Sequence, residues 1–213
     1  MPKLLRSPIF QRWARDAIRA GNKMQTRRVA KPQPAPEFLA RGVVAVVPQW
    51  PAQDGVRWFM ADGLSELRRS PHGRPGDVWG LREPLVRGYA DIVQYADDDE
   101  NVYRETSTGA STLEAWQWKR DTLTSLFMPL WAARTFRTIT DVHVERVQDI
   151  SEADAIAEGL ADAQYHPNPF AEVWDRINGK KPGCAWADNP WNFVYTFRPA
   201  TADEVESAKG TDQ

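Results

Sequence analysis

The sequence predicts an α+β fold, in which short strands alternate with a few short helices. An amphipathic helix pattern stands near the N-terminus, β-branched and aromatic runs of strand length begin at residue 43, and two capped helix patterns follow residue 149. The 213 residues are 42% hydrophobic and include 10 tryptophans, which is ample material for a core. We therefore expect one elaborated domain over residues 1–200.

The first predicted element is a helix over residues 7–20. Apolar residues recur there at helical spacing, namely Ile9, Trp13, Ala17 and Ile18. Gly21 then suits a helix end, because glycine adopts a left-handed backbone conformation at little cost. Beyond it the chain should run extended through residues 25–29, until the proline-rich tract 31–36 interrupts regular structure.

Several strands should follow. Residues 43–47 and 56–60 are β-branched or aromatic runs that indicate a hairpin or two adjacent strands. A dense turn signal over residues 71–77 leads into a predicted strand over residues 78–81, which ends at Arg82 and Glu83. Residues 86–127 contain an acidic run and only short apolar pieces, so we interpret them as an insertion.

The C-terminal part should alternate strands and helices. Residues 135–147 have the alternation of a strand, and residues 152–157 have a helix pattern that Asp149 or Ser151 can cap and Gly159 can end. A second helix is predicted over residues 169–177 and a last strand over residues 192–197. The polar residues 201–213 are interpreted as a disordered tail.

Composition narrows the possible functions. The only cysteine is Cys184, and the histidines at 72, 143 and 166 have no metal-ligand spacing, so we predict neither a metal nor a cofactor. No apolar run approaches the roughly 20 residues of a membrane span, and the first residues lack a signal-peptide pattern. We expect a cytoplasmic protein without a membrane partner. Its oligomeric state stays open.

Positive charge is concentrated near the N-terminus. Residues 12–31 hold seven basic residues and one acid, a local charge of +6, whereas the whole chain carries −2 and the remainder therefore −8. Within this segment, Lys23, Thr26, Arg27 and Arg28 surround a chain reversal. Strand alternation predicts that Thr26 and Arg28 share one face below Lys23, while Arg27 points away. Such a cationic pocket suits a polar or anionic substrate.

The order of these motifs resembles the ASCH family, whose members are small mixed β-barrels of the PUA-like superfamily with flanking helices. The resemblance rests on residues 23–28, on Gly76-Asp77 with Arg82-Glu83, on residues 128–131, on the Ile-Ser-Glu helix start at residues 150–152, and on residues 189–191. It extends over most of residues 7–198 and is strongest to the longer members that bacteriophages and prophages encode, which would place the protein in the cytoplasm of a host cell.

The resemblance implies a function. Bacterial family members that remove the acetyl group from N4-acetylcytidine use a lysine, a threonine and a glutamate, which match Lys23, Thr26 and Glu158 here. Thr26 would attack the acetyl carbonyl, Lys23 would take its proton, and Glu158 would relay a proton to the leaving amine. Additional substrate contacts are predicted from Arg27, Arg28, Arg82, Glu83 and Trp79.

Other functions stay open at this point. The chain could be an RNA-binding module in which the arginines and stacking tryptophans hold the ligand without turnover. It could also be a small ribonuclease, in which the same pocket assists attack by a ribose hydroxyl. Lys23 and Glu158 could instead form a structural ion pair. A role in phage assembly fits least, because a compact cationic pocket has no use there.

Overall fold

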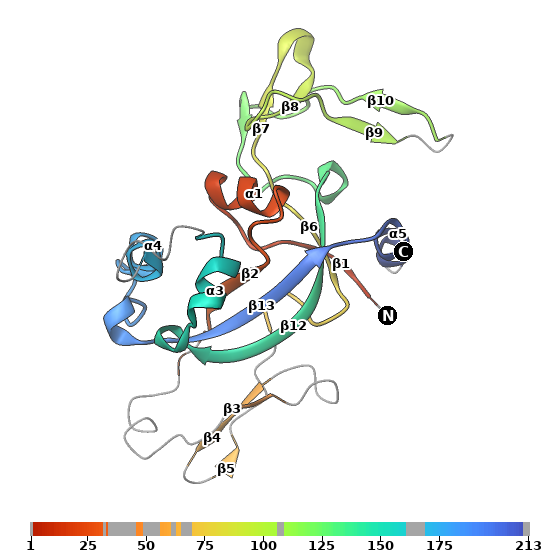
Figure 1. The fold of residues 1–213 in the computed structure, drawn as a ribbon. Coiled ribbons are helices and arrows are strands. Elements are labelled where there is room, and N and C mark those ends of the chain that lie inside the picture. Colours follow the sequence, from red (N-terminus) through yellow and green to blue (C-terminus); the bar gives the residue numbers. More distant parts are fainter. Residues whose placement is uncertain are drawn as a thin grey trace. The chain divides into compact units, whose positions relative to one another are not determined.

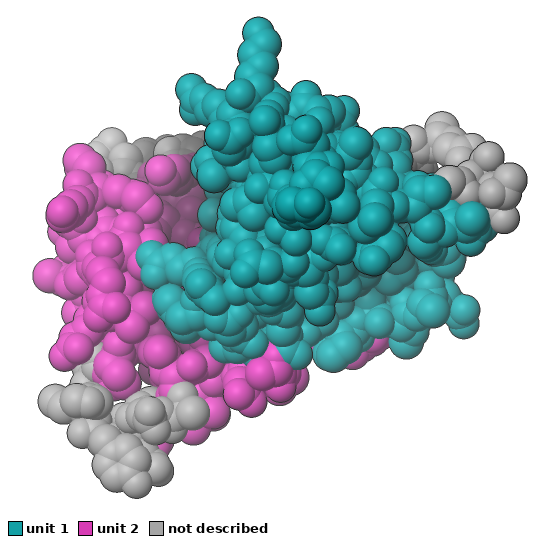
Figure 2. Space-filling model, turned by 90° about the horizontal axis from the view of Figure 1, so that it is seen from above, with its two compact units in different colours: residues 1–19, 77–138, 199–213 teal, residues 20–76, 139–198 magenta. Residues whose placement is uncertain are grey.

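The computed structural model describes residues 2–31, 33, 46–48, 56–60, 63–64, 70–105, 109–160 and 169–210, the three short segments between 46 and 64 by their backbone alone. The chain divides into two compact units, which Figure 2 distinguishes by colour. Unit 1 comprises residues 1–19, 77–138 and 199–213, and unit 2 comprises residues 20–76 and 139–198. The expectation of one elaborated domain over residues 1–200 stays a prediction.

The described residues of unit 1 contribute strands to three sheets. Strands β1 (Leu4–Arg6) and β6 (Val78–Gly80) pair in parallel, and β6 pairs antiparallel with the first residues of β12 (Phe136–Arg146). A second sheet has the order β11-β7-β8, and a third is a two-stranded ribbon of β9 and β10. These strands span Leu85–Arg87 (β7), Val93–Tyr95 (β8), Tyr103–Glu105 (β9), Ser111–Leu113 (β10) and Thr122–Leu123 (β11).

Residues 86–127 have a core of their own in unit 1. Val93, Tyr95 and Val102 are buried with Leu85, Met128 and Ala132. The hydroxyl of Tyr95 donates to the carbonyl of Ala132 at 2.6 Å, which anchors the segment to the short 3-10 helix η2 (Leu130–Ala132). The predicted insertion is therefore built around alternating apolar residues whose runs are too short to stand out in sequence. A further 3-10 turn, η1 (Tyr89–Asp91), connects its first two strands.

Two helices of unit 1 differ from the sequence predictions. Helix α1 (Arg12–Arg19) begins five residues later than expected, and Gly21 follows it with φ +79° as predicted. Helix α5 (Ala202–Lys209) occupies most of the tail that we expected to be disordered. The tail folds because Thr201 and Glu204 form a reciprocal capping box and because Val205 and Ala208 pack beside Val78.

Unit 2 contains a sheet of β2 (Gln25–Val29), β13 (Trp191–Pro199) and the later residues of β12, with β2 and β13 antiparallel (Figure 1). Its second sheet has the order β3-β4-β5. Strands β3 (Val46–Pro48) and β4 (Val56–Met60) form the predicted antiparallel hairpin, followed by β5 (Gly63–Leu64). Residues 43–45 of the predicted first strand lie outside the described residues.

The helices of unit 2 follow their predicted signals. Helix α3 (Glu152–Ala157) is capped by Ser151, whose hydroxyl accepts from the amide of Asp154, and Gly159 ends it with φ +92°. Helix α4 (Pro169–Asn178) buries Phe170 and Trp174 against Val147 and Ala155. The 3-10 turns η3 (Val147–Asp149) and η5 (Trp186–Asp188) complete this part.

The architecture is mixed α+β, with several sheets. None of the sheets formed by the described residues closes on itself, so the small barrel that was expected is not found among them. None of the helices in the described ranges is both long and apolar enough to cross a membrane.

Candidate active site

A buried lysine and a buried glutamate from distant parts of the sequence meet in unit 2. The ammonium group of Lys23 donates to the Glu158 carboxylate Oε2 and, at 2.8 Å, to the backbone carbonyl of Glu158. The two side chains are only 3% and 8% exposed. Lys23 comes from the turn after α1 and Glu158 ends helix α3, so the contact joins residues 135 positions apart.

Backbone hydrogen bonds fix the turn that carries Lys23. The amide of Met24 donates to the carbonyl of Ala157 at 2.8 Å, and the carbonyl of Met24 accepts from the amide of Phe197 at 2.9 Å. Residue 24 is therefore held between the end of α3 and strand β13. This places the Lys23 side chain directly beside the C-terminal end of α3, where carbonyl groups favour a cation.

Arg27 binds the same carboxylate from the other side. Its Nη1 lies 3.2 Å from Glu158 Oε1, and its Nη2 lies 2.6 Å from Glu145 Oε1. Asp154 is 3.5 Å away. The prediction that Arg27 points away from Lys23 is wrong, because the lysine reaches the face of β2 that carries Arg27. We call Lys23, Arg27, Glu145, Asp154 and Glu158 the lysine–glutamate cluster.

Burial sets the protonation behaviour of this cluster. Loss of hydration lowers the pKa of Lys23, and the positive charges of Arg28 and Arg27 lower it further, while Glu158 opposes the shift. Burial raises the pKa of Glu145, but hydrogen bonds from His143 and Arg27 outweigh it and lower the pKa overall. Lys23 is thus closer to its neutral form than an exposed lysine, which is the direction that a general base requires.

His143 extends the cluster along strand β12. Its Nδ1 lies 2.7 Å from Asp141 Oδ2, and its Nε2 lies 3.6 Å from Glu145 Oε2. The hydrogen bond with Glu145 raises the pKa of His143, burial opposes this, and Asp141 adds to the increase. Sequence reasoning dismissed this histidine because no metal-ligand spacing surrounds it, although the alternation of 141, 143 and 145 along one strand face was a usable signal.

Thr26 and Arg28 lie on the opposite face of β2. Thr26 is 3% exposed and stands opposite Tyr195 in the antiparallel ladder, and Arg28 stands opposite Phe193. Directly opposed residues share a sheet face, so Thr26 neighbours Tyr195. The structure therefore confirms that Thr26 and Arg28 share a face, and it brings Lys23 together with Glu158. It does not bring Thr26 to this pair, because Lys23 lies on the Arg27 side of β2 and not on the Thr26 side as predicted.

Tyr195 belongs to a small polar group that sequence reasoning missed. Its hydroxyl is 2.7 Å from Ser70 Oγ, and its ring meets that of His72 edge to face at 5.8 Å. Burial raises the pKa of Tyr195 to about 12, so the phenol stays protonated at neutral pH. Ser70 and His72 lie in the turn before β6, and nothing in their sequence context pointed to the last strand.

The three other predicted substrate residues belong to unit 1. Trp79 is 2% exposed in β6, which leaves its ring no open face for a base. Glu83 is fully buried and is held by Arg19 at 2.6 Å and by Arg134 at 2.8 Å, so it has a structural role. Burial, followed by the charge of Arg6, lowers the pKa of Arg82. The structure assigns none of the three to the lysine–glutamate cluster.

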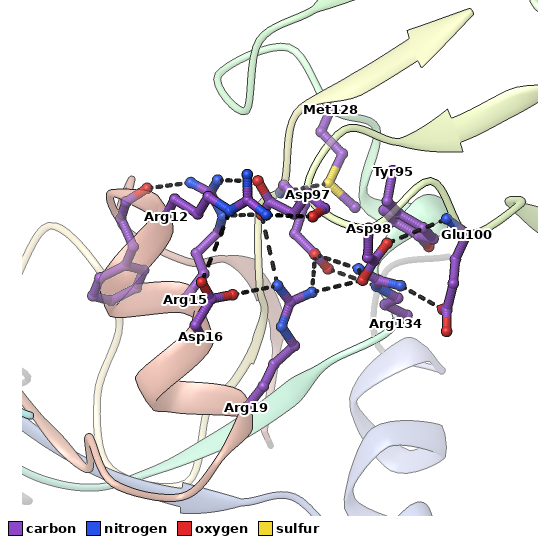
Figure 3. A network of polar contacts seen from close by, with 12 residues as sticks. Arg12, Arg15, Asp16, Arg19, Tyr95, Asp97, Asp98, Glu100, Met128 and Arg134 are labelled. Atoms are coloured by element: carbon purple, nitrogen blue, oxygen red, sulfur yellow. Dashed lines mark hydrogen bonds and ion pairs between the residues drawn. The ribbon is translucent and has the colours of Figure 1, made fainter. Parts of the chain in front are cut away.

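The arginines of α1 also form ion pairs with carboxylates (Figure 3). Arg15 forms a two-pronged pair with Asp97, both distances being 2.8 Å, and Arg134 binds Asp98 at 2.6 Å and Glu100 at 2.5 Å. The network contains Arg12, Arg15, Arg19 and Arg134 against Asp16, Glu83, Asp97, Asp98 and Glu100, a formal charge of −1. The positive segment of the sequence is therefore neutralised at α1 by the acidic run of residues 97–100.

Comparison of the chain with protein-family models, with curated proteins and with solved structures found no match.

Proposed function

We propose that the chain is an ASCH-type hydrolase that removes the acetyl group from a modified nucleoside, with N4-acetylcytidine as the leading substrate and Lys23, Thr26 and Glu158 as the reacting groups. The observation that carries this proposal is the direct contact between the buried Lys23 ammonium and the Glu158 carboxylate. The two residues that the family resemblance selected lie 135 positions apart in sequence and meet in unit 2.

The proposed chemistry begins with a proton transfer. For this step Thr26 must first turn from the opposite face of β2 toward Lys23. Lys23 in its neutral form then takes the hydroxyl proton of Thr26 while the threonine oxygen attacks the acetyl carbonyl. The lysine proton then passes through Glu158 to the exocyclic nitrogen, and the carbon–nitrogen bond breaks to release cytidine. Water hydrolyses the acetyl-threonine ester and gives acetate. Arg28, on the same strand face as Thr26, would stabilise the oxyanion.

Arg27 has a positioning role in this proposal. It binds Glu158 Oε1 while Lys23 binds Oε2, so the carboxylate is held from both sides. Its second partner, Glu145, prevents the arginine from swinging away. Arg27→Lys should therefore reduce turnover less than Lys23→Ala does, because one charge and part of the hydrogen bonding remain.

The test is incubation of the purified protein with N4-acetylcytidine, following the ultraviolet change as the amide is cut. Lys23→Ala, Thr26→Ala and Glu158→Gln should each lower turnover by about 10²- to 10⁴-fold, the usual contribution of a general acid or base. Lys31→Ala, which removes an exposed lysine from the same segment, is the matched control.

The pH profile separates catalysis from a structural ion pair. The ascending, acid-side limb of kcat/KM should report the lowered pKa of Lys23, because the neutral lysine is the active form. Glu158→Gln should move that limb to lower pH, because the glutamate raises the lysine pKa. Folded wild-type protein without turnover would overturn the acetylcytidine proposal. Cleavage of a labelled oligonucleotide to fragments with cyclic-phosphate ends would show that the protein is a ribonuclease instead. Salt-dependent binding of the oligonucleotide without cleavage would show that it is an RNA-binding module.

A further inference from the structure

Two hollows in the described part of unit 1 share one residue, Arg134. One has a volume of about 440 Å³ and an aromatic lining, formed by Tyr95, Glu100, Asn101, Tyr103, Trp131, Ala133 and Arg134. The other has a volume of about 480 Å³ and is lined by three arginines, Arg19, Arg134 and Arg137, and by one acid, Glu206, which pairs with Lys209 at 2.8 Å. Neither hollow contains a residue of the lysine–glutamate cluster.

The aromatic hollow offers one ring to a ligand. Tyr103 is 57% exposed, whereas the guanidinium of Arg134 lies 3.8 Å from the ring centre of Tyr95 and that of Arg104 lies 4.8 Å from the ring centre of Trp131. Tyr103 is therefore the ring on which a planar group can stack. Stacking on an exposed aromatic ring is the sequence-tolerant part of nucleobase recognition.

Polar groups at the same hollow suit the edge of a base. Glu100 accepts from Arg134 through Oε2 at 2.5 Å, and its side chain is 69% exposed. The Asn101 carbonyl oxygen accepts from Gln94 at 3.0 Å, and the amide NH2 of this lining residue is its donor group. A carboxylate held by an arginine fits a base that presents two adjacent N–H donors, and guanine has them at N1 and N2.

The arginine hollow suits an anion. The guanidinium of Arg137 donates to two backbone carbonyls, Phe136 at 2.8 Å and Ile18, and pairs with no carboxylate among the described residues. Burial lowers its pKa, yet arginine stays protonated, so a half-buried positive charge is left without a counterion. A phosphate group would supply that counterion in the geometry that arginine binds best.

We propose that unit 1 binds a guanine nucleotide, with the base stacked on Tyr103 beside Glu100 and the phosphate in the arginine hollow beside Arg137. Arg134 lines both hollows and connects the two parts of the ligand site. Four of its neighbours hold it in place, namely Glu83, Asp98, Glu100 and the ring of Tyr95. The site does not depend on the deacetylation proposed above, since it uses none of the same residues.

The test is titration of the full chain with guanosine 5′-monophosphate, followed by calorimetry or tryptophan fluorescence. Tyr103→Ala should weaken binding roughly ten- to hundred-fold, the usual effect of losing a stacking ring. The control is Tyr89→Ala, which removes another exposed ring, 93% accessible, that does not line the hollow. Lys23→Ala should bind the nucleotide like the wild type, which separates this site from the proposed active site.

Ligand variants test each half of the site. Guanosine should bind about tenfold more weakly than its monophosphate, and Arg137→Gln should abolish this difference while leaving guanosine affinity unchanged. Adenosine 5′-monophosphate binding as tightly as the guanine nucleotide would overturn the role of Glu100. Absence of binding at millimolar concentration, or equal losses in Tyr103→Ala and Tyr89→Ala, would overturn the site.

A short guanine-containing single strand that binds more tightly than the monophosphate would identify RNA as the source of the nucleotide, and equal affinity would identify the free nucleotide.

Discussion

Replacing Glu158 by glutamine should destabilise the protein strongly. The substitution removes the carboxylate that binds both Lys23 and Arg27, and it leaves a lysine that is 3% exposed with an uncompensated charge. Breaking one side of a buried pair costs about 3–5 kcal/mol, and we expect about 3 kcal/mol because the glutamine oxygen still accepts a hydrogen bond. For a chain of this length that corresponds to a fall in Tm of roughly 6–12 °C.

Thermal melts by circular dichroism at pH 7, supported by urea unfolding, measure this change. Glu152→Gln is the control, because it removes an exposed carboxylate from the same helix, and it should change stability by less than about 0.5 kcal/mol. The double variant Lys23→Met with Glu158→Leu should recover part of the loss, since it removes the buried lysine charge, whereas Arg27 still loses one of its carboxylate partners. A Tm within about 2 °C of the wild type for Glu158→Gln would refute the reasoning.

The same pair predicts how stability depends on pH. Because burial lowers the pKa of Lys23, the folded protein binds fewer protons than the unfolded chain between that lowered pKa and the ordinary value of 10.5. Stability should therefore rise with pH through this window. In Glu158→Gln the lysine pKa falls further, so the destabilisation should shrink as the pH approaches 10. A deficit that is constant from pH 7 to 10 would contradict this.

Three further predictions follow from other parts of the molecule. His143→Gln should remove a stability contribution that is present below pH 6.5 and lost as pH rises through the raised pKa of His143, which pH-dependent melts would detect as a flatter profile. Gly80→Ala should cost about 1–3 kcal/mol, because an added Cβ would lie 2.7 Å from Leu130 Cδ1, and Leu130→Ala in the same chain should reduce that cost in urea unfolding. Thr201→Ala should cost about 1 kcal/mol and increase amide exchange over residues 202–209, whereas unchanged exchange would show that the cap is unimportant.

Elements with strong local signals were predicted well. The helix at Glu152–Ala157 carries its own cap and its own terminating glycine, and the strand at Phe136–Arg146 is rich in β-branched residues and has Val142 and Val144 two positions apart. Such patterns depend on neighbouring residues alone. The tail was misjudged because its amphipathic face is small, with Val205 and Ala208 as its buried residues, and it folds only because unit 1 offers them a surface.

The site was predicted in part for a similar reason. Lys23 and Glu158 were selected by their motifs, and their meeting in unit 2 agrees with that choice. The environment of Glu83 could not be predicted, because the arginines that bury it lie 64 and 51 positions away in sequence. Local sequence contains the residue types of an ion pair but does not say which partners meet. For the same reason, the sequence did not predict that the acidic run of residues 97–100 neutralises the arginines of α1.

Neither unit is a continuous piece of chain. Unit 1 needs residues 1–19, 77–138 and 199–213, and its helix α5 packs beside the early strand residue Leu4. During synthesis, about 180 residues must be added after residue 19 before the last segment of unit 1 begins at residue 199. At typical ribosome speeds this takes on the order of ten seconds or more. Strand β13 must be made before unit 2 is complete, and helix α5 must be made before unit 1 is complete. Folding should consequently be late and close to all-or-none, and removal of residues 199–213 should leave a chain that chaperones and proteases recognise as unfinished.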